Sequence, residues 1–167
     1  MNEIEAIIRD LKLEPHPEGG YFRETYKSNG EISREHLGPD FNGKRNFSTC
    51  IFFLLTSGMF SAFHRIRQDE IWHFYKGIPI RLHMITAEGE YANVLIGNEF
   101  DNGEIPQFVV PGGVWFAAET FGENGYSLAG CTVSPGFDFD DFEMADREEL
   151  LARFPQHRAV IAKFTRT

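Results

Sequence analysis

Apolar residues near the N-terminus repeat every three or four positions, which is the period of an amphipathic helix. They are Ile4, Ile7, Ile8 and Leu11. Asn2 stands before them as a helix cap, with Glu5 as its capping-box partner three positions on. The pattern predicts a first helix that ends before Pro15, a turn over 17–20 and a strand over 21–26.

From residue 46 the pattern changes to a period of two and keeps it as far as residue 134. Short alternating runs are separated by turns, most of which contain glycine, and no helical period lies between them. The predicted strands cover 46–56, 59–67, 69–76, 78–86, 90–96, 106–111, 114–119 and 126–134. Many short strands at regular spacing are typical of an antiparallel sandwich or barrel. We therefore expect an all-β fold, a barrel with short helices at its N- and C-terminal ends.

Two further segments, one polar and one helical, complete the outline of the chain. The polar stretch 28–44, with three glycines and a proline, predicts a long mobile loop. Asp146 and Glu149 form a second capping box before a helical pattern that Pro155 ends, and 156–164 predicts one more short helix. We expect one domain over 1–167, with a helix and turn over 1–20, the barrel over 21–143 and helices over 144–167.

Composition and charge exclude several classes of protein. The 25 acidic residues exceed the 16 Lys and Arg, and the formal net charge of -9 disfavours nucleic acid as a partner. An apolar content of 42%, with 17 Phe, supports a packed core and excludes disorder. No apolar run approaches the roughly 20 residues that span a membrane. The acidic N-terminus and two distant cysteines, Cys50 and Cys131, predict a soluble cytoplasmic protein with free thiols.

Candidate chemistry lies in the segment 58–77. If its two strands meet at a turn, alternation places His64 and Glu70 on facing strands, both directed inwards. A histidine and a carboxylate in this arrangement can share a hydrogen bond or a metal ion. The same alternation directs Trp72 and Phe74 inwards beside Glu70.

This segment resembles the first conserved motif of the cupin superfamily. Four residues fall on the spacing of that motif: Gly58, His64, Glu70 and Gly77. Ile66 stands where the motif has its second metal-binding His. In the stretch 111–116, which resembles the second cupin motif, Phe116 takes the His position, and Thr120 takes the Asn position beyond it.

The resemblance is most specific to a fifth cupin family, which is a domain of unknown function. The matching stretches are spread along the chain, at 16–24, 63–66, 69–75 and 135–139. The resemblance implies a double-stranded β-helix, the cupin jelly roll, and a homodimer. It brings no established reaction.

The resemblance also implies a metal site of three His and one Glu, of which this sequence keeps His64 and Glu70. Two protein ligands seldom hold a transition metal, since catalytic sites usually supply at least three. Alternation turns His73, the nearest substitute, to the other face of its strand. We therefore expect no metal and no other cofactor, and a metal-dependent cupin enzyme with a reduced ligand set is an alternative.

Without a metal, His64 beside Glu70 is a candidate general base, with a pKa raised by the carboxylate and lowered by burial. The metal-free deoxysugar-nucleotide 3,5-epimerases of the superfamily use a barrel His as base and a Tyr as acid. We expect a small-molecule ligand in the barrel, a carbohydrate or sugar nucleotide, and an isomerase or epimerase reaction with His64 as base and Glu70 as its orienting or charge-balancing partner. A non-catalytic ligand-binding or storage-like cupin is the competing hypothesis.

The residues expected to bind the ligand are Trp72, Phe74, Phe116, Arg23 and Tyr21. The first three would form an apolar wall on which a sugar ring stacks. Arg23 is a candidate cation for a diphosphate, with Arg45 as another. The candidates for a catalytic acid are Tyr21, Tyr26 and Tyr75.

Several polar residues are given no chemical role. Arg65 and Arg67 alternate outward from the barrel. The acidic residues of 138–143, interleaved with Phe, predict a solvated edge segment docked by its aromatic rings. His16 precedes a proline and is expected to shape a turn, and His83 lies on an outward strand face.

Overall fold

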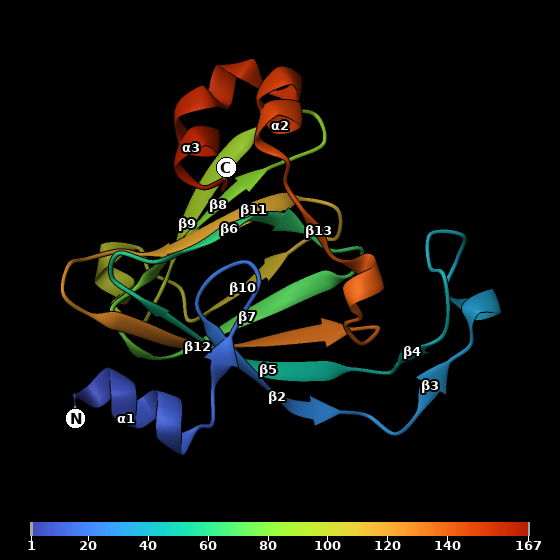
Figure 1. The fold of residues 1–167 in the computed structure, drawn as a ribbon, viewed down its shortest axis with the longest axis horizontal. Helices are drawn as coiled ribbons and strands as arrows, with labels where there is room; N and C mark the ends of the chain where they lie inside the picture. The colour runs from blue at the N-terminus through green and yellow to red at the C-terminus, as the bar shows by residue number, and fades with distance from the viewer. Residues whose placement is uncertain (1, 167) are drawn as a thin grey trace.

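Two antiparallel sheets form the body of the protein, described by a computed structural model for residues 2–166 (Figure 1). The six-stranded sheet has the order β1 (Glu14–Pro15), β2 (Tyr21–Lys27), β5 (Thr49–Thr56), β12 (Tyr126–Ser134), β7 (Asp69–Gly77) and β10 (Gln107–Val110). The five-stranded sheet has the order β13 (Glu143–Met144), β6 (Phe60–Arg65), β11 (Trp115–Thr120), β8 (Ile80–Ile85) and β9 (Tyr91–Ile96). β3 (Glu31–Ile32) and β4 (Arg45–Asn46) pair apart from both sheets.

The expected all-β class is confirmed, in the form of a jelly-roll sandwich. Each predicted strand between residues 46 and 134 is present, with its ends displaced by a few residues. Within residues 2–166 no ladder joins the two sheets, so the sandwich stays open at its edges instead of closing into a barrel. The core lies between the sheets, where alternation directs Leu82 and Met84 of β8 against Trp72 and Phe53 of the facing sheet.

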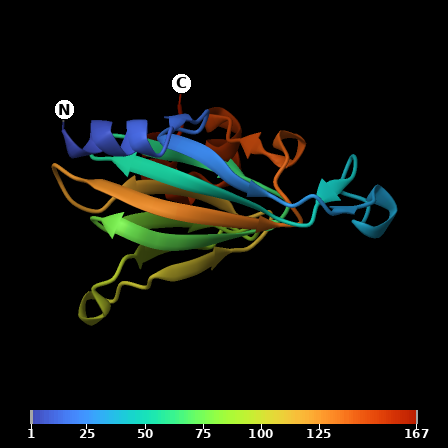
Figure 2. The same ribbon diagram turned by 90° about the horizontal axis from the view of Figure 1, so that it is seen from below.

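Helices cover the outer faces of the two sheets (Figures 1 and 2). α1 (Glu3–Asp10) begins with the predicted Asn2–Glu5 capping box and packs its apolar side against the six-stranded sheet. α2 (Arg147–Arg153) and α3 (Arg158–Lys163) cover the five-stranded sheet. No helix among the described residues has the length and apolar character to cross a membrane. The predicted terminal helices are therefore present, and each completes a layer of the core.

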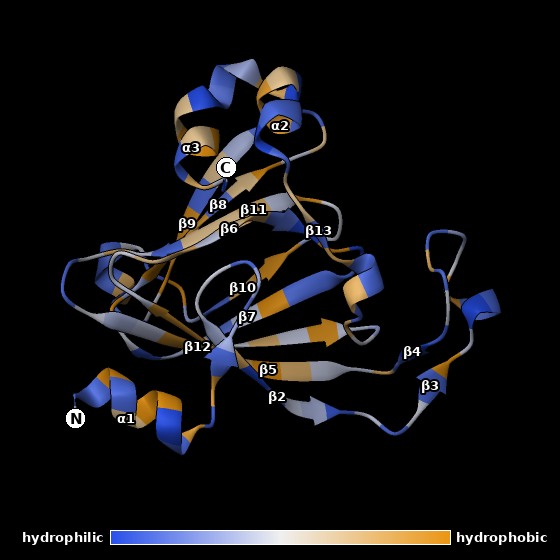
Figure 3. Ribbon diagram, viewed as in Figure 1, coloured by the Kyte–Doolittle hydropathy of each residue, from blue (hydrophilic) through white to orange (hydrophobic). Residues whose placement is uncertain are grey.

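Four short 3-10 turns complete the described structure: η1 (Arg34–His36), η2 (Phe100–Asn102), η3 (Phe139–Asp141) and η4 (Pro155–His157). The segment 28–44 carries β3 and η1, so it is more ordered in its backbone than a featureless loop; its mobility stays a prediction. In Figure 3 this segment is largely hydrophilic, whereas α1 and the central strands carry hydrophobic residues.

The turn before β2 brings the N-terminal segment across the end of β6. Gly19 and Gly20 have φ angles of 115° and 78°, in the left-handed region that favours glycine. A Cβ atom at Gly19 would lie 2.1 Å from the carbonyl oxygen of Phe60. The Ala62 amide donates to the Glu18 carbonyl oxygen at 2.8 Å. The two glycines thus permit a close approach that places the Glu18 side chain beside β6.

Candidate functional site

A small cavity lies between the two sheets at the end of the sandwich near η3. Its volume is about 80 Å³. Strands of both sheets and the segment after β12 contribute the lining residues, which are His16, Phe22, Glu24, Thr49, Ile51, His64, Ile66, Glu70, Cys131, Val133, Phe137, Phe139 and Phe142. The cavity is therefore mostly apolar, with a few titratable groups concentrated on its walls.

His64 is held by two acceptors, one at each ring nitrogen. Its Nε2 lies 3.0 Å from Oε2 of Glu18, and its Nδ1 lies 2.7 Å from the Ala62 carbonyl oxygen. Burial lowers the pKa of His64, but the charge and hydrogen bond of Glu18, the charge of Glu70 and the Ala62 carbonyl together raise it above its ordinary value. Since both nitrogens face acceptors, the doubly protonated imidazolium is the form that satisfies them.

Glu18 is the anion that balances this imidazolium. Its Oε1 accepts a hydrogen bond from the Ser61 hydroxyl at 2.9 Å. Burial raises the pKa of Glu18, but the charge and hydrogen bond of His64 outweigh it and keep the pKa below its ordinary value. His16 does not form a firm ion pair with Glu18. Its Nδ1 accepts a hydrogen bond from the Glu18 amide at 3.2 Å, and burial lowers the pKa of His16.

Glu70 is the second carboxyl group of the site, on β7. Burial and the negative charge of Glu18 raise its pKa to about 7, against smaller opposing effects, of which that of the His64 charge is the largest. The expected inward direction of His64 and Glu70 is confirmed. Their expected direct pairing is wrong: no hydrogen bond or ion pair joins them in the described residues, because Glu18 occupies the Nε2 side of His64.

The aromatic wall of the cavity differs from the expected one. Trp72 and Phe116 belong to the core cluster, and Phe74 packs against it; none of the three lines the cavity. The ring of Phe116 lies under His64, with 4.1 Å between the ring centroids. The wall is built instead by Phe22 and by the phenylalanines of the segment 137–142.

Tyr21 and Arg23 lie outside the cavity as well. Alternation along β2 turns Phe22 and Glu24 to the cavity, so Tyr21 and Arg23 take the opposite face. There Arg23 donates to the Leu11 carbonyl oxygen at 3.0 Å, and Tyr21 packs against α1. Tyr21 and Arg23 therefore do not face the cavity, in contrast to the expectation that they bind a ligand in it.

The other expected acids and cations are also placed elsewhere. Tyr26 and Tyr75 are exposed and line no part of the cavity. Arg45 is paired with Asp141. Asp141 itself is buried, so the acidic run 138–143 is not a solvated edge throughout, because Arg45 and Gln68 satisfy its carboxylate.

A second, larger hollow adjoins the cavity and shares Ile66 and Phe142 with it. Its volume is about 690 Å³, and Arg65 and Arg67 line it, as their outward alternation allows. Arg65 is paired with Glu143 at 2.7 Å. His83, which the sequence places on an outward strand face, is buried on that face because α3 covers it, and the tilted ring of Phe164 packs against its ring with 4.5 Å between the centroids.

The donor set does not fit a metal ion. Among residues 2–166, no group of three or more His, Cys, Asp or Glu is placed to hold one. Ile66 and Phe116 fill two positions where the cupin motifs have His, and His64 has no free ring nitrogen. As predicted, His73 faces away from the cavity, where Thr132 and Gln107 bond its ring nitrogens.

Sequence reasoning missed Glu18, Cys131 and the phenylalanines of 137–142. Glu18 is 46 positions from His64, and no alternation pattern links a turn to a distant strand. The available signal was the glycine pair after Glu18, which marks a close backbone approach. For the segment 137–142, the signal was the spacing of Phe between acidic residues.

Comparison with known proteins agrees with this fold. The family model described as Cupin superfamily (DUF985) matches residues 5–145. An uncharacterized protein of Saccharomyces cerevisiae, YML079W, is 32% identical over an alignment 174 positions long, which covers 96% of this chain and 85% of the yeast protein.

Solved structures give the same result. Protein SO0799 from Shewanella oneidensis is 41% identical, with a TM-score of 0.89 over 99% of both chains. A hypothetical protein from Leishmania major is 37% identical, with a TM-score of 0.90 over 99% of this chain and 100% of the other. Oxalate decarboxylase from Bacillus subtilis shares only the fold, at 16% identity and a TM-score of 0.53, over 90% of this chain and 36% of the other. The chain therefore belongs to the cupin superfamily, in the family of domains of unknown function called DUF985.

Proposed function

We propose that this chain is an acid–base isomerase of the epimerase type, which binds a small organic molecule in the cavity and moves a proton on it. The observation that carries the proposal is Glu70, a buried carboxyl group on the cavity wall with a pKa of about 7. A group with this pKa is present in both protonation states at neutral pH, as a general acid and base requires. Perturbed carboxyl groups in a cavity are frequent at catalytic sites.

The roles of the two expected catalytic residues are exchanged in this proposal. His64 offers no lone pair to a substrate, because both ring nitrogens are directed at acceptors. Its positive charge, held in place by Glu18, is suited to stabilising negative charge that develops on a bound molecule. Glu70 is then the base and the acid in turn, and His64 is the electrostatic group.

The size and charge of the cavity indicate the class of ligand. Glu24 and Glu70 line the cavity, and Glu18 already pairs with its one imidazolium, so a carboxylate or phosphate inside the cavity would meet an excess of negative charge. The cavity of about 80 Å³ is also well below the roughly 300 Å³ of typical ligand sites. A small neutral hydroxycarbonyl compound, related to a carbohydrate, fits both limits better than a whole sugar nucleotide.

The proposed reaction moves one proton and changes no oxidation state overall. The Glu70 carboxylate takes a proton from a carbon next to a carbonyl group, and the electron pair of that C–H bond forms an enolate. The charge of His64 stabilises the enolate oxygen. Glu70 then returns the proton to the same carbon, and the enolate becomes the carbonyl compound again.

Glu70→Gln is expected to slow proton exchange on such a compound by roughly 100-fold or more, since the amide cannot take a proton. The measurement is deuterium incorporation into hydroxyacetone and other small hydroxycarbonyl compounds in heavy water, followed by proton NMR. Glu90→Gln is a matched control, because Glu90 is an exposed carboxylate outside the cavity. Equal exchange rates in the wild type and Glu70→Gln would refute the assignment.

Non-catalytic ligand binding is a second candidate function, favoured by the mostly apolar lining of the cavity. The same experiment separates the two functions. A compound that raises the melting temperature of the protein but keeps all its C–H protons after long incubation in heavy water supports binding without turnover.

We also propose that the chain forms a homodimer through the outer face of the six-stranded sheet. Tyr26, Tyr75 and Val109 are exposed there, although each is large and apolar over much of its surface. Pairing with a second copy of the chain through this face would cover all three side chains. Tyr75→Asp is expected to convert a dimer into a monomer in light scattering, and a monomeric wild type would contradict the proposal.

A further inference from the structure

We propose that the segment 137–142 is a movable cover of the cavity and that Asp141 is its positioning residue, which holds the cover closed through a buried ion pair with Arg45. The inference rests on the proposed function only in taking this cavity as the ligand site. Its test needs no ligand.

Three phenylalanines of the segment, Phe137, Phe139 and Phe142, form one wall of the cavity. Phe139 is stacked on His16, with 6.1 Å between the ring centroids and 29° between the ring planes. It is 52% exposed, so this ring separates the cavity from solvent. Its neighbours pack edge-on against it, at 5.0 Å for Phe137 and 5.9 Å for Phe142.

Of the walls of the cavity, the segment 137–142 is also the one that the fewest backbone hydrogen bonds hold to the sheets. Most of the other lining residues belong to strands with paired neighbours. The segment 137–142 is joined to the sheets mainly through one hydrogen bond, from the Phe137 amide to the Thr49 hydroxyl at 2.9 Å; its other backbone bonds are local to η3. Because the closed cavity is small for a ligand site, entry requires one wall to move, and this wall can do so without breaking a ladder.

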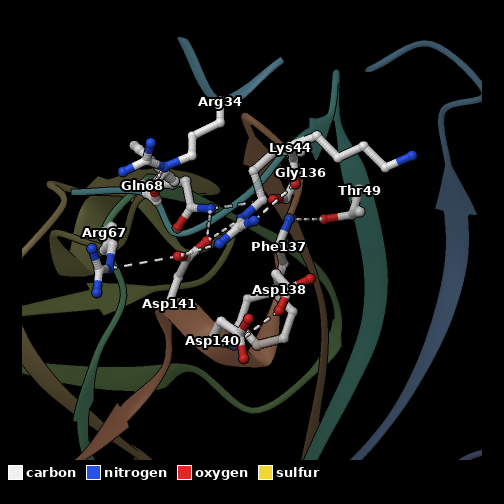
Figure 4. A network of polar contacts seen from close by, with 12 residues as sticks. Arg34, Lys44, Thr49, Arg67, Gln68, Gly136, Phe137, Asp138, Asp140 and Asp141 are labelled. Atoms are coloured by element: carbon white, nitrogen blue, oxygen red, sulfur yellow. Dashed lines mark hydrogen bonds and ion pairs between the residues drawn. The ribbon is translucent and has the colours of Figure 1, made fainter. Parts of the chain in front are cut away.

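A buried polar cluster fastens the cover at both ends (Figure 4). Asp141 is 4% exposed, and its carboxylate accepts hydrogen bonds from Nε and Nη2 of Arg45, each at 2.7 Å. Gln68 donates to the same carboxylate at 2.8 Å and to the Gly136 carbonyl oxygen at 3.2 Å. One amide from the turn between β6 and β7 therefore holds the beginning and the end of the cover.

We call the contacts of Asp141 with Arg45 and Gln68 the clamp, and Arg67 contributes little to it. Its Nε lies 3.5 Å from Asp141, whose oxygens already accept three shorter hydrogen bonds (Figure 4). Arg45 belongs to β4, directly after the segment 28–44, and its guanidinium lies 5.6 Å from the centre of the Phe41 ring. The clamp thus connects the cover with a second peripheral segment, so the two are expected to move together.

The thiol of Cys131 provides a probe for opening. It lines the cavity and is 3% exposed, so a reagent reaches it only when the cover opens or the protein unfolds. The background variant is Cys50→Ser, which leaves Cys131 as the only thiol. In that background, Asp141→Asn is expected to speed methyl methanethiosulfonate labelling of Cys131 about tenfold or more, because it weakens charge-assisted hydrogen bonds. Mass spectrometry of quenched samples gives the rate.

Two further variants separate opening of the cover from general destabilisation. Asp140→Asn changes an exposed carboxylate of the same turn that takes no part in the clamp, and is expected to label at the background rate. Phe139→Ala removes the ring over His16 without touching the clamp and is expected to speed labelling too. In Asp141→Asn and Phe139→Ala the labelling rate should depend only weakly on urea concentration, since local opening exposes little surface.

Equal labelling rates in Asp141→Asn and Asp140→Asn would overturn the proposal. So would a faster rate that rises with urea as steeply as global unfolding does, or an unchanged rate in Phe139→Ala. These outcomes are independent of the reaction at Glu70. Unchanged exchange in Glu70→Gln together with fast labelling in Asp141→Asn would refute the proposed reaction and keep the cover.

Discussion

Glu18→Gln is expected to lower the free energy of unfolding by about 3–5 kcal/mol, because it leaves the His64 imidazolium buried without its counter-ion. Glu18 and His64 are both buried, and their side chains meet at 3.0 Å. His64 can escape this penalty only by releasing its proton. The loss is therefore expected to be larger at pH 5 than at pH 8.

The pH dependence of the pair follows from the two shifted pKa values. The raised pKa of His64 gives stability that is present below 6.5 and is lost as pH rises through its folded value. The lowered pKa of Glu18 gives stability that is present above 4.5 and is lost as pH falls through its folded value. The Glu18–His64 pair thus contributes most to the stability of the folded state between about pH 4.5 and 6.5.

Urea unfolding followed by tryptophan fluorescence measures the effect of Glu18→Gln. Glu143→Gln is the matched control, because it breaks the Arg65–Glu143 pair at the surface, where such pairs contribute about 1 kcal/mol or less. The double variant Glu18→Gln/His64→Phe is expected to recover part of the loss, since it removes the unpaired charge. An effect of Glu18→Gln no larger than that of the control would contradict a buried ion pair.

Glu70→Gln is expected to have the opposite effect and to stabilise the protein by about 3 kcal/mol at pH 8. The pKa of Glu70 is raised from 4.5 to about 7, so the folded state binds more protons than the unfolded state in this interval. Stability therefore falls as pH rises from about 4.5 to 7, and glutamine removes this loss because it is neutral at every pH. One pKa unit corresponds to about 1.4 kcal/mol.

The test is the same unfolding experiment at pH 4.5 and pH 8. The two proteins should differ little at pH 4.5, where Glu70 is protonated in the folded state, and the difference should grow as pH rises. A variant less stable than the wild type at pH 8 would show that ionised Glu70 makes favourable contacts. Stabilisation together with lost exchange would be the trade-off typical of a catalytic group.

The alternation of side chains along strands predicted much of the fold and part of the site. It predicted the strands, the inward direction of His64 and Glu70 and the outward direction of His73, because side chains of a strand take opposite faces in turn. Alternation alone does not say which face of β2 is the inner one, and Tyr21 and Arg23 lie on the outer face. A strand flanked by known partners is better determined than one at the end of the pattern.

The partner of His64 could not be predicted in the same way. Glu18 belongs to a turn, and its position follows from the left-handed glycines and the contact with β6, not from any period. The acidic sequence neighbours of Asp141 predict a solvated face. Asp141 is buried instead, where a buried arginine from a distant strand stabilises its carboxylate. Both residues depend on tertiary contacts between segments far apart in sequence.

The clamp between Arg45 and Asp141 also bears on how the chain acquires its cavity during synthesis. The two residues are 96 positions apart. Contacts of such long range form late, because closing a large loop is slow. On the ribosome, a chain that already contains His64 and Glu70 still lacks Asp141 and the three phenylalanines of 137–142. The nascent sandwich therefore exposes its carboxyl groups and apolar lining to water until residues 137–142 have emerged.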